Sequence, residues 1–180
     1  MNLHSTMKRA ADEEQLKLNP LPKHIVASLP ENLRLQYALL LCALLGAQPI
    51  ISEHQTRLTC LLLDALSLGD IRGSLFEQAR ELNEETILQS ARLIREYGLA
   101  HFLLVDALVL LRLDIPLDDE AAGLISEFAS FLDVHENALK KCSLLAACIL
   151  GLDTAMSERI AKEWPGAFIG FGKPSVCLER

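Results

Sequence analysis

One stretch of the chain, residues 102–137, constrains the fold more than any other. It reads FLLVDALVLLRLDIPLDDEAAGLISEFASFLDVHEN. Nearly every position up to Leu113 is apolar, which is typical of a helix surrounded by other helices. An acidic turn with a proline follows, and the next residues repeat their apolar positions with the period of an amphipathic helix. We therefore expect one buried helix at the centre of a helical array.

Composition points to the same fold class. Apolar residues make up 51% of the 180 residues and aromatic residues only 5%, so the core must be largely aliphatic. A chain of this length forms one domain that buries roughly 70% of its unfolded surface. No stretch alternates with the period of two that a half-buried strand would show. The sequence predicts an all-α fold, a compact multi-helix array of about eight helices.

Capping signals place the helix boundaries. Ser28-Leu-Pro-Glu31 and Ser52-Glu-His-Gln55 have the form of capping boxes. Asp70, Asn83, Asp118 and the segment from Asp133 to Glu136 offer further N-caps, and glycines follow several apolar runs. A short helix is expected over 22–28. Longer ones are expected over 31–46, 52–68, 70–82, 83–97, 99–113, 118–132, 133–150 and 154–163.

Two segments of the chain resemble each other. A shift of 64 residues superposes Leu39 on Leu103 and Ala43 on Ala107, whereas the turns between the helices align better at a shift of 66. Such self-similarity is the signature of a repeated supersecondary unit. We predict two pseudo-repeated helix-pair units, over 37–70 and 102–137.

The two ends of the chain differ from its middle. Residues 1–20 are polar and lack a period, so we expect a flexible arm before a helical domain over 21–164. Residues 165–180 form a tail rich in Gly, Pro and aromatic residues. One interpretation is an extended strap that packs Trp164, Phe168 and Phe171 back onto the helices. The other is a docking segment for a partner, or the edge of a further domain.

The turns between the paired helices resemble the TerB-like family, named for tellurite-resistance proteins. The family pattern is roughly Ala-Asp-Gly-x-Ile-Ser-x-x-Glu, and residues 47–55 match it at Ala47, Ile51 and Ser52. Residues 113–121 match it at Asp114, whereas Gln48-Pro49 replaces the acidic-Gly pair in the first turn. The resemblance covers about residues 37–150. It implies an all-helical module of bacterial stress-response or phage-defence complexes, with an association with metal.

The acidic residues of the second turn are the nearest approach to a metal site. They are Asp114, Asp118, Asp119 and Glu120. A hard divalent cation, the one cofactor we consider, needs six or more converging oxygen ligands. Three of these residues also stand where N-caps and first-turn acids belong, so helix capping is the other interpretation.

Asp64 and Asp106 interrupt otherwise apolar helices and are candidates for buried polar groups. A buried carboxylate needs a partner or a shifted pKa, and such groups cluster at functional sites. The candidate partners are Arg57, Arg95, His101 and Arg112. The alternative is a hydrogen bond at a helix end, a structural ion pair, or a position at the rim of the core that reaches water.

Charge and motif content narrow the function classes. The net charge of −7 and the pI near 5.2 argue against binding to nucleic acid. The longest apolar run, residues 37–47, is too short to span a membrane, which needs about 20 residues. The five cysteines form no CxxC pair, and no signal peptide is recognisable, so a cytoplasmic protein is expected. The sequence contains no zinc-binding, nucleophile-elbow or phosphate-loop motif that would predict an enzyme.

The sequence thus favours a non-catalytic adaptor or regulatory module. It would bind a protein partner through an apolar groove or through its tail, in bacterial stress response or defence as the resemblance implies. The alternative is a divalent-metal-responsive TerB-like protein that uses residues 114–120. The oligomeric state stays open.

Overall fold

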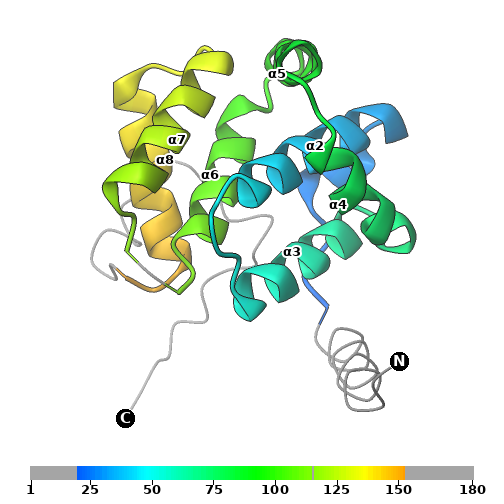
Figure 1. The fold of residues 1–180 in the computed structure, drawn as a ribbon, viewed down its shortest axis with the longest axis horizontal. Coiled ribbons are helices and arrows are strands. Elements are labelled where there is room, and N and C mark those ends of the chain that lie inside the picture. Colours follow the sequence, from blue (N-terminus) through cyan, green and yellow to red (C-terminus); the bar gives the residue numbers. More distant parts are fainter. Residues whose placement is uncertain (1–19, 115, 153–180) are drawn as a thin grey trace.

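The computed structural model describes residues 20–114 and 116–152, and within these ranges every regular element is a helix (Figure 1). The all-α prediction is confirmed, and the described residues form seven α-helices where about eight were predicted for the whole chain. The arm over 1–19, the helix over 154–163 and the tail over 165–180 lie outside the described residues. The elements in order are η1 (Ile25–Ser28), α2 (Glu31–Gly46), α3 (Glu53–Ala65), η2 (Gly69–Ile71), α4 (Arg72–Arg80), α5 (Glu84–Glu96), α6 (Ala100–Leu111), α7 (Asp119–Phe131) and α8 (Glu136–Ile149).

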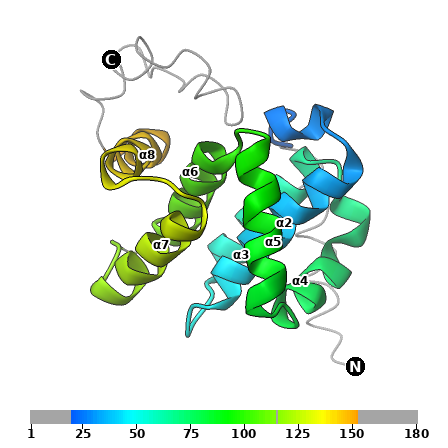
Figure 2. The same cartoon turned by 90° about the horizontal axis from the view of Figure 1, so that it is seen from above.

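Helices α2 and α6 form the centre of the fold. Helix α2 packs along α4 and also against α5 and α6, and α6 packs along α8 (Figure 2). In α6, ten of the twelve residues are buried, which confirms the central helix expected from its all-apolar sequence. Leu103, Leu104 and Leu108 are among the fully buried side chains. Their burial against α2 and α8 removes apolar surface from water and is the main stabilising term.

The repeat consists of three helices rather than two. Helix α3 packs against α6 and η2, whereas the close partner of α2 is α4, two helices along the chain. The same relation joins α6 to α8. Adding 66 to the bounds of α3 gives those of α7, and α8 begins 64 residues after α4. The predicted helix pairs are therefore parts of two three-helix units, α2–α4 and α6–α8, with α5 between them.

The second helix of each unit ends in the same backbone conformation. Ser67 after α3 and Asp133 after α7 have positive φ angles of 61° and 55°. In both turns an amide reaches back to close the helix end: the Leu68 N–H donates to the Leu63 carbonyl at 2.8 Å, and Val134 N–H to Ala129 at 2.9 Å. The N-cap predicted at Asp133 is therefore wrong. This residue ends α7, and His135 takes the N-cap of α8.

Local capping chemistry explains three other helix starts. The capping box at Ser52 is confirmed: its hydroxyl accepts from the Gln55 N–H at 3.0 Å, and Gln55 Oε1 accepts from the Ser52 N–H at 2.9 Å. Asn83 and Asp118 cap α5 and α7 as predicted.

The box predicted at Ser28 does not form. The Ser28 hydroxyl donates to the Ile25 carbonyl inside η1, and Pro30 takes the N-cap of α2. Asp70 lies in η2 and does not cap α4, whose N-cap is Ile71.

Two further properties follow from these helices: whether any of them could span a membrane, and how deeply their cysteine thiols are buried. Within the described ranges, no helix combines the length and apolarity that crossing a bilayer requires. Cys42, Cys142 and Cys148 are buried and Cys60 is half-buried. Burial, with Cys60 nearby, raises the pKa of the Cys42 thiol to about 12. These thiols therefore pack as small apolar groups, as the sequence predicts.

Candidate functional site

Asp106 lies in the interior with two polar partners. Only 3% of the surface of this residue is exposed. Carboxylate Oδ2 accepts from the Tyr37 hydroxyl at 2.6 Å and lies 3.1 Å from His24 Nε2. The predicted burial of Asp106 is confirmed, but neither partner was among those expected. Both belong to segments far away in sequence, so no local pattern could have revealed them.

His24 is held in one tautomer by its neighbours. The Val26 N–H donates to His24 Nδ1 at 3.2 Å, so the proton resides on Nε2 and points at the Asp106 carboxylate. The backbone N–H of His24 also donates a hydrogen bond to the Ala65 carbonyl at 3.2 Å. Residues 24–28 are thereby fixed to α2, α3 and α6. Burial, followed by the charge of Asp106 and its hydrogen bond, raises the pKa of Tyr37 well above its ordinary value.

Asp64 does not share this environment. Its side chain is 39% exposed and lies 3.8 Å from Arg72 Nη1, measured at Oδ2. A Cβ at Gly69 would collide with Asp64 Oδ1, so the carboxylate rests against the bare backbone of η2. The prediction of a buried Asp64 is wrong, because α3 turns this position outward between its buried leucines. The ion pair of Asp64 with Arg72 at the rim of the core agrees with the alternative interpretation of the sequence.

Asp114 joins the turns of the two repeats. Its Oδ2 accepts from the Ser52 hydroxyl, and its Oδ1 lies 2.8 Å from His54 Nδ1. These bonds, first that of Ser52 and then that of His54, lower the pKa of Asp114 although partial burial opposes them. Ser52 and Asp114 are both positions that match the TerB-like pattern. The structure thus connects the two matching turns to each other.

The other acids of the second turn serve α7. Asp118 accepts from the Ala121 N–H at 2.8 Å as the N-cap, and Asp119 and Glu120 stand in the first turn. Acidic groups at this end complement the helix dipole. In the described part of the chain, no three His, Cys, Asp or Glu side chains lie close enough to hold a metal ion. The four predicted ligands are therefore not gathered around one point.

An apolar groove opens between the two units. It has a volume of about 110 Å³ and runs between α2 and α7, with one residue of α5 at its edge. Neither Asp64 nor Asp106 reaches it. Helices α2 and α7 each pack more closely against α6 than against each other, which leaves the space between them open. The lining residues are Leu40, Ala43, Leu44, Ala47, Ile87, Leu124, Glu127, Phe128 and Phe131.

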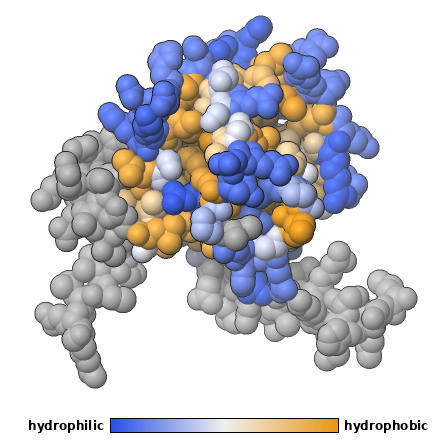
Figure 3. Space-filling view, turned by 60° about the vertical axis from the view of Figure 1, so that its left-hand side comes forward, coloured by the Kyte–Doolittle hydropathy of each residue, from blue (hydrophilic) through white to orange (hydrophobic). Residues whose placement is uncertain are grey.

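Each wall of the groove is one stripe of a helix. Leu40, Ala43, Leu44 and Ala47 follow the spacing i, i+3, i+4, i+7, as do the four lining residues of α7. Ala43 and Ala47 are small, so the α2 wall is low at its end and Ala47 is exposed. On the face drawn in Figure 3, apolar residues reach the surface in patches that hydrophilic residues border. One signal in the sequence could have revealed this groove: leucine changes to alanine along one face of α2.

The rim of the groove is acidic. Glu127 lines it, and Asp119 and Glu120 stand earlier on α7. Glu84 and Glu85 occupy the first turn of α5, just before the lining residue Ile87. All five acids are exposed. Helix α7 contains no lysine or arginine.

Comparison with known proteins gives no family for this chain. No family model, curated protein or solved structure matches it. The TerB-like resemblance therefore stays a prediction that depends on residues 47–55 and 113–121. The predicted partner-binding residues Trp164, Phe168 and Phe171 lie outside the described residues.

Proposed function

We propose that this chain is a non-catalytic helical module that binds another protein in the groove between α2 and α7. The observation that carries the proposal is the groove itself, with eight apolar residues and one glutamate along its walls. Leu40, Leu44 and Phe128 are buried, and the half-buried lining residues present apolar surface beside the exposed Glu127. An apolar centre bordered by polar residues is the usual anatomy of a recognition surface. The family resemblance suggests an adaptor or regulator in bacterial stress response or defence, and we propose that it acts in the cytoplasm.

The polar groups outside the groove support this assignment by their structural roles. Asp106 holds His24 and Tyr37 in the interior, and Asp114 holds the two turns together. Asp118 is occupied as a helix cap. For the divalent-metal alternative, no three of the four predicted ligands converge within the described residues.

Site-specific photo-crosslinking in cells of the native host tests the proposal. A benzoylphenylalanine replaces Ala47 in the groove of the full-length chain, or Leu144 on α8 as the control. Leu144 is a suitable control because it is 40% exposed and does not line the groove. We expect one defined protein to crosslink through position 47 and not through position 144. Equal crosslinking at both positions, or none at position 47, would contradict a docking role for the groove.

A pair of polar variants provides the matching loss-of-function test. Ala47→Gln with Leu124→Gln introduces amides into the groove without a change in charge, and Leu144→Gln makes the same exchange on α8. The crosslinked partner should be lost from the first variant and retained by the second. Circular dichroism melts check that both remain folded.

A further inference from the structure

We infer that the occupant of this groove is a basic amphipathic α-helix of a partner protein. The inference rests on the proposed function and adds the secondary structure and the charge of what binds. Shape and electrostatics support it separately.

The shape of the groove fits a helix. Its two walls are stripes of the i, i+3, i+4, i+7 kind, one from α2 and one from α7. From Leu40 to Ala47 such a stripe is about 10 Å long, or two helical turns. An amphipathic helix lays its own i, i+4 and i+7 side chains into a groove of this type. A docked helix would occupy the space between α2 and α7 that is open in the folded chain.

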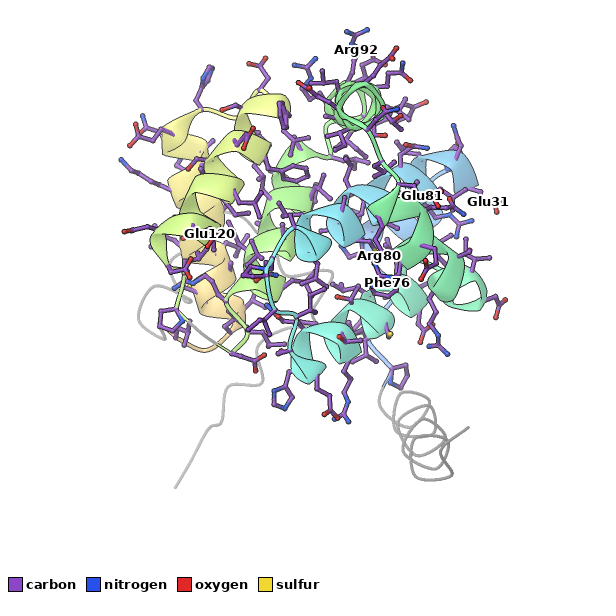
Figure 4. All side chains as sticks on the ribbon, viewed as in Figure 1. Glu31, Phe76, Arg80, Glu81, Arg92 and Glu120 are labelled. Atoms are coloured by element: carbon purple, nitrogen blue, oxygen red, sulfur yellow. The ribbon has the colours of Figure 1, made fainter. Side chains whose placement is uncertain are left out.

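The charges around the groove select the sign of that helix. Three segments surround it: residues 35–47 of α2 and the turn after it, residues 84–90 of α5, and α7. Together they contain five acidic residues, Glu84, Glu85, Asp119, Glu120 and Glu127, and no lysine or arginine. The basic residue Arg92 stands on the second half of α5 and points away from the other helices (Figure 4). Lysine or arginine beside the apolar face of the partner would therefore meet charges of opposite sign only.

The same charges disfavour the three occupants that this chain could supply itself. A second copy would bring another acidic groove rim and carries a net charge of −7. Residues 1–19 contain three basic and three acidic residues, and residues 153–180 contain four of each, so neither segment offers a net positive charge. A separate basic helix matches the rim better than any of these.

Calorimetry with designed peptides tests the inference on the full-length chain. The probe is a peptide of about 16 residues, built of Leu, Ala and Lys with one leucine face. A second peptide has Glu in place of Lys, and a third has the composition of the first without an apolar face. We expect the basic peptide to bind at least about tenfold more tightly than the others, and more weakly as salt rises.

Charge reversal at the rim provides the decisive variant. Glu127→Lys should weaken the basic peptide about tenfold. Glu31→Lys is the matched control, because the exposed Glu31 begins α2 (Figure 4), at the opposite end of that helix from the lining residue Ala47. Equal affinity for the acidic peptide, or no effect of Glu127→Lys, would overturn the inference.

The remaining outcomes separate this inference from the proposed function. If the Ala47→Gln/Leu124→Gln variant loses binding while Glu127→Lys does not, the groove docks a helix but not a basic one. If Trp164→Ser with Phe168→Ser strengthens peptide binding, the chain's own tail is the occupant. If sedimentation shows a dimer that the groove variant abolishes, a second copy is the occupant. The last two results also contradict the inference.

Discussion

Two aspartates of this protein have the same kinds of partner in opposite environments. Asp106 accepts from a tyrosine hydroxyl and faces a histidine in the interior. Asp114 accepts from a serine hydroxyl and faces a histidine at the surface. The difference in burial decides what each set contributes. An unpaired polar group costs far more in the interior than in water, so the interior set should determine stability and the surface set should only adjust it.

The comparison also separates structure from recognition. A carboxylate beside a histidine and a hydroxyl is the kind of arrangement that catalytic sites use. Here one set is enclosed by the core and the other connects two turns, and neither lines the groove. Their geometry accounts for them as connections within the fold: one fixes residues 24–28 to the centre, and the other fixes the first unit to the second.

The largest expected effect comes from removing each carboxylate in turn. Asp106→Ala leaves the Tyr37 hydroxyl and the His24 Nε2–H buried without an acceptor. The free energy of unfolding should fall by about 3 kcal/mol and Tm by about 10 °C. Asp114→Ala makes the same chemical change at the surface, and Tm should shift by about 2 °C or less. Thermal melts of the two variants measure the contrast directly.

Equal falls in Tm for Asp106→Ala and Asp114→Ala would show that burial does not determine how much each aspartate set contributes to stability. Asp106→Asn is the milder version of the first change, because it retains one acceptor oxygen. Its Tm should lie between those of Asp106→Ala and the unaltered chain.

The next effect is the dependence of stability on alkaline pH. The folded-state pKa of Tyr37 is raised, so its contribution is fully present below the unfolded pKa of about 10. It is lost as pH rises through the folded pKa. Tyr37→Phe should cost about 1 kcal/mol near neutral pH, and it should flatten the fall in stability above pH of about 10.

Urea midpoints at neutral and alkaline pH measure this slope. Tyr97→Phe is the control, because Tyr97 is 55% exposed. If the alkaline slope survives in Tyr37→Phe, the interior hydroxyl is not the group responsible.

The smallest effect concerns the surface set. The folded-state pKa of Asp114 is lowered, so its contribution is present above the unfolded pKa of about 4 and is lost as pH falls through the folded pKa. Ser52→Ala removes the largest cause of the shift and should raise the pKa of Asp114 more than His54→Ala does. It also removes the N-cap of α3, at a cost of about 1 kcal/mol.

A carbon-detected NMR titration of the Asp114 carboxyl gives both pKa values. A larger rise in His54→Ala than in Ser52→Ala would reverse the order of the two contacts. No change in either variant would show that Asp114 is not held by these groups in solution.

The sequence predicted features that depend on neighbouring residues. The caps at Ser52, Asn83 and Asp118 follow from side chains that bond within three residues of themselves. The buried α6 follows from its unbroken apolar run. The N-caps predicted at Ser28 and Asp133 are wrong for a local reason that the sequence pattern does not show. A residue type that can cap the next helix can also end the previous one, as the Ser28 hydroxyl does at η1 and the backbone of Asp133 does at α7.

Contacts between distant residues were outside the reach of the sequence. His24 and Asp106 meet because the residue just before η1 lies against the end of α3 and the middle of α6, and no spacing in the sequence encodes that contact. The groove was foreseen only as a class of surface. Its position depends on α2 and α7 packing against α6 with a gap between them, which is a property of the three-helix repeat.

The account depends on the claim that recognition takes place in the groove, while both aspartate sets serve the fold. A backbone-amide NMR map of the full-length chain, titrated with the basic peptide, tests this most directly. The largest shift changes should fall on residues 40–47 of α2 and 124–131 of α7, with Asp106 and Asp114 nearly unchanged. Changes concentrated around the contact of Asp114 with Ser52, or spread evenly over the molecule, would contradict the claim.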